Sequence, residues 1–346
     1  MRVLITGGAG HIGKATTERL LQRGWVVRVI GIDTGTQIEG AEYIQCNILN
    51  YDDVLKHTRG CDAVIHLAAI RSPIMAAGHE VFQVNAAGTF NVFEAAAAVG
   101  IRRVVQASSI NALGCFYGLG DIQAEYFPID EAHPTNTTDP YSFSKQVVED
   151  IGDYYWRRDG ISSVALRFPG VYLRGFALTE AYQQRRESAH RLLDELVSQP
   201  EDVQKARIAE VRQRALEYRK TRPFEFNPEV PETRWPNLPD DPLFRTFTVD
   251  RFNLWAFIDE RDAAQSLEKG LTADYEGAHA LFINDHLNSI GYDSRTLVRL
   301  FFPEISEAQN HLTGTESLVS IEKARKLISF EPEYSTEKLE QPGALS

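Results

Sequence analysis

The 346-residue sequence predicts an α/β protein with a doubly wound parallel sheet, a smaller C-terminal α/β part that binds substrate, and a helical insertion. Two observations predict the sheet. Apolar runs rich in Val, Ile and Leu alternate with amphipathic or alanine-rich stretches over residues 1–175, and a glycine-rich turn follows the first run. Apolar runs with few polar interruptions are typical of parallel strands buried on both faces, and a repeated strand–helix order covers both faces with helices.

The first part of the chain holds most of the expected elements. The predicted strands are 2–6, 26–32, 62–67, 102–107 and 162–167, and the predicted helices are 12–23, 79–99 and 141–157. Each helix lies between two apolar runs, as the crossover connection of parallel strands requires. Residues 1–175 are therefore expected to form one nucleotide-binding domain.

The composition changes after residue 175. Residues 176–222 are rich in Glu, Arg and Gln. Ser198 and Pro200 mark a helix start, and the apolar stripe of this helix is Ile208, Val211, Ala215 and Tyr218. Residues 223–245 hold six of the fifteen prolines together with Phe224, Phe226, Trp235 and Phe244, which predicts an extended aromatic segment. We expect residues 176–250 to form a lid on the substrate side.

Regular elements return near the C-terminus. Strands are predicted at 255–258 and 280–283, and a helix near 321–328. Residues 251–346 are expected to be the remainder of the substrate part, with strands that return to the core.

Composition excludes several classes of protein. The net charge of −12 argues against nucleic acid as a partner, because a phosphate backbone attracts clustered Lys and Arg. No apolar run approaches the roughly 18–20 residues that span a bilayer. We expect no cleaved leader, because residues 2–6 already form the first strand. Three irregularly spaced cysteines predict reduced thiols rather than disulfides or a metal site, and a cytoplasmic protein.

The turn after the first strand carries the strongest functional signal. Gly7 allows the sharp turn off the strand, Gly10 allows backbone N–H groups to approach a pyrophosphate, and Gly13 allows the helix to lie close to the sheet. The phosphates would face the positive end of a helix that begins near His11 and Ile12. This pattern predicts a dinucleotide site.

Asp33 closes the second apolar run, twenty residues after Gly13. A carboxylate at this point accepts hydrogen bonds from a free ribose 2′-hydroxyl and repels a 2′-phosphate. The following residues, 34–36, are Thr-Gly-Thr and supply no arginine for a phosphate. The expected cofactor is therefore NAD rather than NADP.

A second constellation indicates hydride chemistry. Tyr141 and Lys145 are spaced i, i+4, so both lie on one face of the helix that starts after Asp139. Ser108 and Ser109 end the strand at 102–107, at the sheet edge where ligands bind. We expect the Lys145 ammonium to lower the pKa of the Tyr141 phenol by most of the roughly 3 units that a general base at neutral pH needs.

Taken together, these residues resemble the extended short-chain dehydrogenase/reductases, and specifically the NAD-dependent epimerase/dehydratase family with its Rossmann fold. The resemblance covers nearly all of the chain except about 176–250. The motifs that carry it are 6–13, 66–69, 85–89, 107–109, 141–145, 166–172 and 257–262.

The resemblance implies a role for each motif. Tyr141 would be the general acid/base, Lys145 its activator and a ligand of the nicotinamide ribose, and Ser109 the donor to the reacting oxygen. The residues expected at the cofactor are Gly7, Gly10, His11, Ile12, Gly13, Asp33, Asn47, Ile48, Leu67, Ala68, Ala69, Ser108, Tyr141, Lys145 and Pro169. Asn85 and His66 are equally compatible with cofactor contact and with a structural role.

Departures from the family pattern bear on the substrate. Ile110 and Asn111 stand where sugar dehydratases and decarboxylases of this family carry an acid, which disfavours those reactions. Gly170 replaces an Asn that anchors the diphosphate of nucleotide sugars. The candidate substrate contacts are Arg71, Asn111, Gly170 and Arg174. The two arginines suit a carboxylate or phosphate, or equally a surface role.

These expectations lead to an NAD-dependent enzyme that removes a hydride from a secondary alcohol of a sugar or sugar acid. Three alternatives remain open: a nucleotide-sugar epimerase that retains NAD, an NADP-dependent reductase of aromatic carbonyl compounds, and an NAD-binding sensor without turnover. The aromatic residues of the insertion either stack on a sugar or pack a small core of their own.

The family resemblance also implies a homodimer. The helices near 85–99 and 141–157 would form the contact. The alanines at 95–98 suit a close contact between subunits, and equally suit packing on the chain's own sheet.

Overall fold

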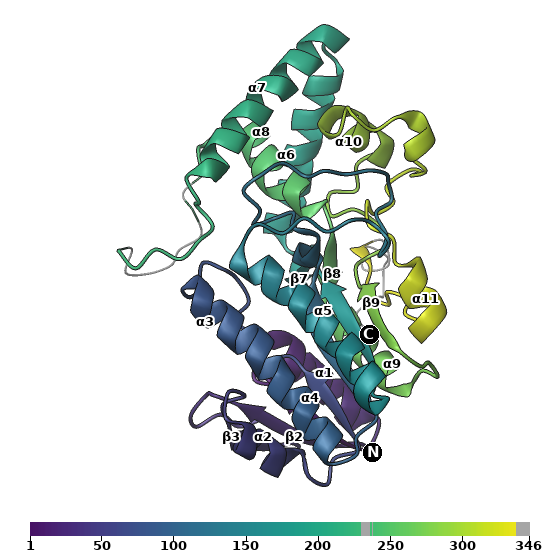
Figure 1. Cartoon of the computed structure of the whole chain (residues 1–346). Helices are drawn as coiled ribbons and strands as arrows, with labels where there is room; N and C mark the ends of the chain where they lie inside the picture. Colours follow the sequence, from purple (N-terminus) through teal and green to yellow (C-terminus); the bar gives the residue numbers. More distant parts are fainter. Residues whose placement is uncertain (230–235, 237, 337–346) are drawn as a thin grey trace.

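The computed structural model describes residues 1–229, 236 and 238–336. Its centre is a seven-stranded, fully parallel sheet with the strand order β3-β2-β1-β4-β5-β6-β9 (Figure 1). The strands are β1 Arg2–Thr6, β2 Val26–Gly31, β3 Glu42–Gln45, β4 Ala63–His66, β5 Arg103–Ser109, β6 Ser162–Phe168 and β9 Ala278–Phe282. The predicted doubly wound sheet is confirmed, and every predicted strand is present with its ends shifted by no more than two residues.

Helices cover both faces of this sheet. On one face lie α2 Tyr51–Thr58, α4 Gly88–Ala98 and α5 Pro140–Asp159, and on the other lie α1 His11–Gln22, α9 Glu260–Thr272 and α11 Glu322–Ile328. Side chains alternate along each strand, so Val3 and Ile5 face α1 and α9, whereas Leu4 faces α2 and α4. The sheet is therefore buried on both sides, as its apolar strands indicated.

The predicted helix at 79–99 is divided. It consists of α3 Gly78–Phe82, a π-turn at Gln83–Ala87 and α4. The π-turn turns Asn85 inward, where its side chain accepts a hydrogen bond from the Ile70 N–H at 2.8 Å and donates to the Ile70 carbonyl at 3.0 Å. Ala95 and Ala96 are fully buried against the sheet, so these two alanines of the 95–98 run pack on their own subunit.

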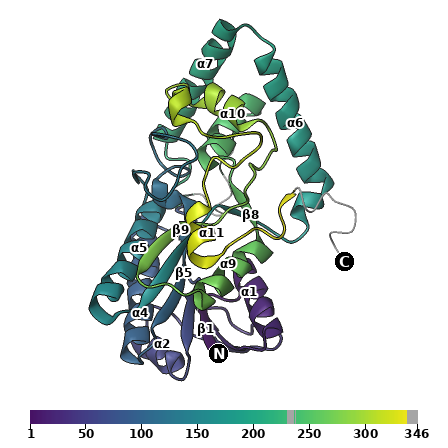
Figure 2. The same ribbon diagram turned by 90° about the vertical axis from the view of Figure 1, so that its right-hand side faces the viewer.

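The region after the sheet domain forms a helical hairpin. Helices α6 Glu180–Val197 and α7 Glu201–Lys220 meet at the turn between them, diverge from it and extend beyond the sheet (Figures 1 and 2). The helix predicted from Pro200 onward is α7, with Pro200 as its N-cap residue and Ile208, Val211 and Ala215 buried. Trp235 lies outside the described residues. A short helix, α8 Pro242–Arg245, and a π-turn at Thr246–Asp250 complete the insertion.

The C-terminal part supplies strands to two sheets of the protein. Strand β9 joins the main sheet beside β6, while β7 Gly170–Tyr172 and β8 Phe257–Asp259 form a separate parallel pair. Helix α10 Ser294–Phe301 packs on α7. A third hydrophobic core joins the insertion, α10 and the long segment at 110–129.

Two further observations concern the described part of the chain. Within it, no helix combines the length and apolar character needed to cross a membrane. Cys46, Cys61 and Cys115 are buried free thiols, and burial raises the pKa of Cys46 to about 11 and of Cys115 to about 12.

Candidate active site

The glycine turn forms a cradle at the carboxyl end of β1. Gly7 has a φ of +69°, and a Cβ there would lie 2.6 Å from the backbone nitrogen of Ala68. A Cβ at Gly13 would lie 2.4 Å from the Cα of Gly8. Helix α1 starts at His11 with Gly10 as its N-cap, and both residues are exposed. The exposed positive end of α1 and the close backbone packing fit the diphosphate of a dinucleotide.

The adenosine side of the expected cofactor site lies at the ends of β2 and β3. The side chain of Asp33 is exposed, and its backbone carbonyl accepts a hydrogen bond from the Tyr43 hydroxyl at 3.0 Å. Asn47 accepts the Leu49 N–H at 3.0 Å through its side-chain oxygen. Ile48 is buried. The Asp33 carboxylate therefore faces solvent beyond the cradle, whereas the Asn47 amide oxygen is engaged in a local turn.

The residues after β4 continue this surface. The N–H groups of Leu67 and Ala68 both donate to the Thr6 hydroxyl at 3.2 Å. Leu67, Ala68 and Ala69 remain partly exposed beside the glycine turn. These contacts hold the three residues next to the cradle, where the sequence places them at the cofactor.

His66 and Asn85 take the structural role that the sequence left open. His66 is 3% exposed and lies between the hydroxyls of Thr6 and Thr89, at 2.6 and 2.9 Å. Burial, with a smaller effect of Lys145, lowers the pKa of His66 to about 3, so the ring is neutral. Asn85 also donates to the Ser144 hydroxyl at 3.0 Å and thereby links α5 to the loop after β4.

Three predicted catalytic residues meet where β5 ends and α5 begins. Asp139 caps α5 by accepting the Ser142 N–H, and Pro140 occupies the first turn, so the helix starts immediately before Tyr141. The Ser109 oxygen accepts hydrogen bonds from the Asn111 N–H at 3.1 Å and the Asn111 amide at 3.3 Å. Its own proton is then free to be donated toward the Tyr141 phenol, whose pKa the Ser109 side chain lowers.

The electrostatics of Tyr141 differ from the sequence expectation. Burial raises the pKa of the Tyr141 phenol, and Tyr117 raises it further, whereas the Ser109 side chain and the charge of Arg71 lower it. Lys145 donates to the Ala107 carbonyl at 2.8 Å, and its nitrogen lies 5.9 Å from the centre of the Tyr141 ring. The expected lowering by Lys145 is therefore not found: Ser109 and Arg71 are the groups that lower the pKa, and desolvation of the phenol outweighs them.

Lys145 itself is 4% exposed. Burial lowers the pKa of its ammonium to about 8, and the nearby Glu149 carboxylate partly opposes this shift. A lysine with a pKa near neutrality exchanges protons readily at physiological pH. The site therefore holds a phenol, a hydroxyl and a titratable amine within one buried cluster.

Ser108 has a different environment from Ser109. Neighbouring residues of a strand point to opposite faces, and the Ser108 hydroxyl donates to Glu149 at 2.6 Å. Arg167 binds the same carboxylate through two nitrogens, at 2.8 and 2.9 Å. The Ser108 hydroxyl thus belongs to a buried network that joins β5, α5 and β6.

The four candidate substrate contacts are dispersed. Arg71 is exposed and its charge reaches the Tyr141 phenol. The Asn111 side chain donates to the Ser109 oxygen through its amide nitrogen and accepts the Phe116 N–H at 3.0 Å through its amide oxygen. Arg174 is half exposed and pairs with Glu18 of α1 at 2.9 Å, which matches the surface role left open for it.

Residues 169 and 170 border the site at the end of β6. Pro169 is buried, and its expected role behind the nicotinamide stays a prediction. Gly170 is exposed, and a Cβ there would lie 3.8 Å from the Asn253 amide nitrogen, which is an ordinary contact. Space alone therefore does not require glycine at this position.

Sequence reasoning missed three residues: Tyr117 beside Tyr141, and Glu149 and Arg167 beside Ser108. Tyr117 packs edge-on against the Tyr141 ring, with ring centres 5.5 Å apart. Glu149 and Arg167 form the network described above. Arg167 lies in the family-like motif at 166–172, and Glu149 follows Lys145 by one helical turn. Their positions in the sequence could therefore have indicated that both lie near the predicted site. Tyr117 lies in an irregular segment that carries no periodic signal.

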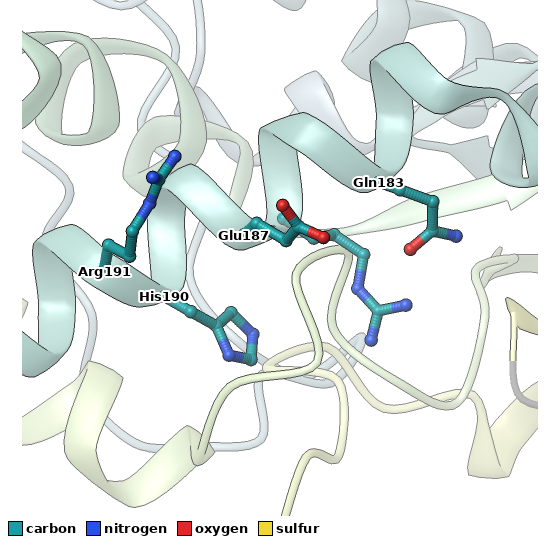
Figure 3. Close-up of a pocket in the computed structure, with 5 residues that line it drawn as sticks. Gln183, Glu187, His190 and Arg191 are labelled. Carbon is teal, nitrogen blue, oxygen red and sulfur yellow. The ribbon is translucent and has the colours of Figure 1, made fainter.

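A wide surface cavity of about 620 Å³ lies elsewhere, along α6. It is lined by Gln183, Arg186, Glu187, His190 and Arg191, and Figure 3 shows these side chains on α6 above neighbouring loops. None of the predicted site residues lines it. This cavity is therefore separate from the residues that the sequence predicts at the active site.

Sequence comparison gives matches to one family and to several curated relatives. The profile of the NAD dependent epimerase/dehydratase family matches residues 3–208. L-arabinose 1-dehydrogenase (NAD(P)(+)) of Haloferax volcanii is 33% identical over 172 residues, which cover 48% of this chain and 65% of the relative. Uronate dehydrogenase of Pseudomonas putida is 33% identical over 168 residues, covering 48% and 59%.

A third relative has another activity in its name. The putative UDP-glucose 4-epimerase of Methanocaldococcus jannaschii is 32% identical over 177 residues, which cover 49% of this chain and 56% of the relative. The matched region thus spans less than two thirds of the length of each of these three relatives.

Solved structures share the fold at lower identity. A short-chain dehydrogenase/reductase superfamily protein from Agrobacterium tumefaciens with bound NAD superposes with a TM-score of 0.63 at 21% identity, covering 100% of this chain and 96% of the other. UDP-glucose 4-epimerase from Thermotoga maritima with UDP-glucose gives 0.61 at 18% identity, covering 97% and 95%. These likenesses extend the agreement in fold to the whole chain.

Proposed function

The chain belongs to the NAD dependent epimerase/dehydratase family, as its motifs predicted, and from this premise we propose that it removes a hydride from a secondary alcohol of a sugar or sugar acid. The observation that carries the proposal is the buried cluster of Ser109, Tyr141 and Lys145 at the carboxyl end of β5, in which the Ser109 side chain acts on the Tyr141 phenol and Lys145 lies 5.9 Å from its ring centre. A hydroxyl donor and a phenol at one point suit proton transfer at a carbinol.

Each residue has a defined part in the proposal. Tyr141 Oη takes the proton of the substrate hydroxyl, and the Ser109 hydroxyl orients the same oxygen. The amine of Lys145 has a pKa of about 8 and lies 5.9 Å from the centre of the Tyr141 ring. In the proposal it passes on the proton that the phenol takes from the substrate. When bound, oxidised NAD would supply the hydride acceptor and a positive charge that favours the ionised phenol.

We propose NAD rather than NADP as the cofactor. The exposed Asp33 carboxylate at the end of β2 suits ribose hydroxyls, and the cradle of Gly7, Gly10 and Gly13 suits the diphosphate. Replacing Asp33 by Asn removes the negative charge that repels a 2′-phosphate. The affinity ratio of NAD to NADP, measured by titration calorimetry, is then expected to fall by about tenfold or more.

The proposal is tested with the purified chain. Bound nucleotide is identified first, and sugars, sugar acids and nucleotide sugars are then screened for NADH absorbance. We expect net NADH formation with a sugar or sugar acid. Tightly retained NAD with conversion of a nucleotide sugar and no net NADH would instead support the epimerase alternative, which the M. jannaschii relative brings forward.

Substitution of the phenol provides the internal control. Tyr141→Phe is expected to lower turnover by about 10³-fold while NAD affinity stays unchanged, because only the proton acceptor is lost. Tyr154→Phe on the same helix, at an exposed position, should leave turnover unchanged. An active Tyr141→Phe enzyme would refute the assignment of the base.

We also propose that the chain forms a homodimer through α3, α4 and α5. Four aromatic side chains on these helices are between 37% and 49% exposed: Phe82, Phe90, Phe143 and Tyr154. They stack in pairs, Phe82 on Phe143 and Phe90 on Tyr154. Contiguous exposed aromatic surface is typical of a protein interface.

Light scattering after gel filtration tests this proposal, and the wild type is expected to have the mass of two chains. A variant with both Phe90→Asp and Phe143→Asp should be a monomer, because two charges cannot be buried at the contact. Val203→Asp on α7, also partly exposed, is the matched control and should leave the dimer intact. A wild-type mass of one chain would overturn the proposal.

A further inference from the structure

A second phenol lies against the proposed catalytic phenol. The Tyr117 ring meets the Tyr141 ring edge-on, with ring centres 5.5 Å apart and planes at 87°. The Ser72 side chain lowers the pKa of the buried Tyr117 phenol, and the charge of Arg71 acts on both phenols. Tyr117 therefore lies between Tyr141 and the loop after β4, which carries Arg71 and Ser72.

One buried arginine of the insertion holds the segment that carries Tyr117. Arg219, near the end of α7, is fully buried. One of its nitrogens donates to the carbonyls of Phe116 and Gly118, both at 2.9 Å, and the other donates to the Thr248 carbonyl at 2.9 Å. Phe116 and Gly118 are the immediate neighbours of Tyr117, so a single guanidinium fixes the backbone on both sides of this residue.

The same end of the insertion contacts the second loop that borders Tyr141. The Phe224 ring is 2% exposed and packs 6.2 Å from the Tyr117 ring. Two residues later, the Phe226 N–H donates to the Pro73 carbonyl at 2.9 Å, next to Ser72. Residues 219–226 thus contact two segments: the one that carries Tyr117 and the loop after β4 that carries Ser72.

We propose that Tyr117 is a positioning residue for Tyr141, and that the insertion, through Arg219 and Phe224, holds Tyr117 as a fixed wall of the active site rather than moving as a lid. The edge-to-face contact restricts the rotation of the Tyr141 ring and keeps its oxygen at Ser109. Opening of this wall would leave three buried carbonyls without a donor. The inference rests on the proposed function in that Tyr141 is taken as the base.

The first experiment measures the position of Tyr141 without turnover. In protein labelled with ¹³C at the tyrosine Cζ, the Tyr141 signal is assigned by its loss in Tyr141→Phe. Arg219→Lys keeps the charge but offers one nitrogen on a shorter side chain, which cannot bind the flanking carbonyls and the Thr248 carbonyl together, and we expect it to shift or broaden the Tyr141 signal. Arg207→Lys, on the same helix and paired with Glu195 at the surface, should leave the signal unchanged.

A folded Arg219→Lys protein with an unchanged Tyr141 signal would overturn the proposal. Unchanged NAD affinity shows that the sheet domain is intact in each variant. If Arg219→Lys does not fold, the Tyr117 variants below decide the question.

The second experiment separates the ring from the hydroxyl of Tyr117. Tyr117→Leu removes the ring, and we expect a broadened Tyr141 signal and a fall in kcat of at least tenfold, with the KM for NAD unchanged. Tyr117→Phe retains the ring and should restore kcat to within about threefold of wild type. Identical Tyr141 signals in both variants and the wild type would refute the positioning role.

The two proposals fail in distinguishable ways. A wild-type chain that oxidises no alcohol would overturn the proposed function, and the Tyr141 signal would still report whether Tyr117 positions the phenol. An active enzyme whose kcat is the same in Tyr117→Leu, Tyr117→Phe and wild type would overturn the positioning role alone.

Discussion

The sheet domain and the insertion each bury a cation, and they use it differently. Lys145 in the sheet domain makes a hydrogen bond to one carbonyl, and burial lowers its pKa to about 8. Arg219 in the insertion binds three carbonyls, and burial together with Arg251 lowers its pKa to about 9. An amine that exchanges its proton near neutrality suits chemistry, whereas a planar group with several donors suits attachment of one segment to another.

The largest expected effect is the loss of the attachment in the insertion. Arg219→Met removes the donors to Phe116, Gly118 and Thr248, and we expect a loss of about 4 kcal/mol in the free energy of unfolding, because buried acceptors lose their partners. Urea denaturation measures it. Arg207→Met should cost less than about 0.5 kcal/mol, because Arg207 is exposed. Equal effects would show that the insertion does not depend on its buried cation.

The pH dependence of stability tests the cation of the sheet domain. Between pH 8 and 10.5 the unfolded lysine keeps its proton and the buried one has lost it, so stability rises with pH in this window. Relative to Lys145→Met, the wild type should gain about 3 kcal/mol across it. Urea denaturation of both proteins at several pH values measures the difference, in which all other groups cancel. A constant difference would place the pKa of Lys145 at its ordinary value.

The glycine cradle tests how tightly the sheet domain is packed. Gly13→Ala places a methyl group 2.4 Å from backbone that cannot rotate away, and we expect a loss of about 2 kcal/mol together with weaker NAD binding. Gly10→Ala meets its nearest atom at 3.7 Å, and its stability should be unchanged. Thermal unfolding and NAD titration provide the readouts, and a stable Gly13→Ala protein would contradict the close approach of α1.

The smallest effect is expected at a surface ion pair within residues 1–175. Arg174→Ala breaks only the half-exposed contact with Glu18 and should change stability by less than about 0.5 kcal/mol and kcat/KM by less than about twofold. Arg71→Ala should raise the substrate KM by about tenfold, because the Arg71 charge lies near Tyr141. A large effect of Arg174→Ala on KM would return this residue to the substrate site.

The same contrast explains what could be predicted from the sequence. Strands buried on both faces have continuous apolar runs, and the glycine turn, Tyr141 and Lys145 have fixed spacings along the chain. Strand β3, Glu42–Gln45, was missed because it is a short edge strand with a largely polar sequence. Helix α2, Tyr51–Thr58, was missed because it has only eight residues, although Asn50 caps it.

Long-range contacts account for the remaining omissions. Arg219 and the carbonyls of Phe116 and Gly118 are separated by about a hundred residues of sequence, and backbone acceptors leave no residue type to recognise. The raised pKa of Tyr141 likewise follows from burial, which spacing does not reveal. The grouping of the glycine turn, Ser109, Tyr141 and Lys145 at one edge of the sheet was therefore predictable, and the contacts of Arg219 with residues 116 and 118 were not. The division of the chain at residues 175 and 250 stays a prediction.

Because Arg219 donates to main-chain carbonyls, its hydrogen bonds do not themselves involve the side chains of residues 116 and 118. Those residue types are fixed for other reasons: Phe116 is buried among the aromatic residues of the insertion, and a Cβ at Gly118 would lie 2.5 Å from the Gly114 carbonyl oxygen. Shortening α7 by a single residue would move the guanidinium out of register with all three carbonyls.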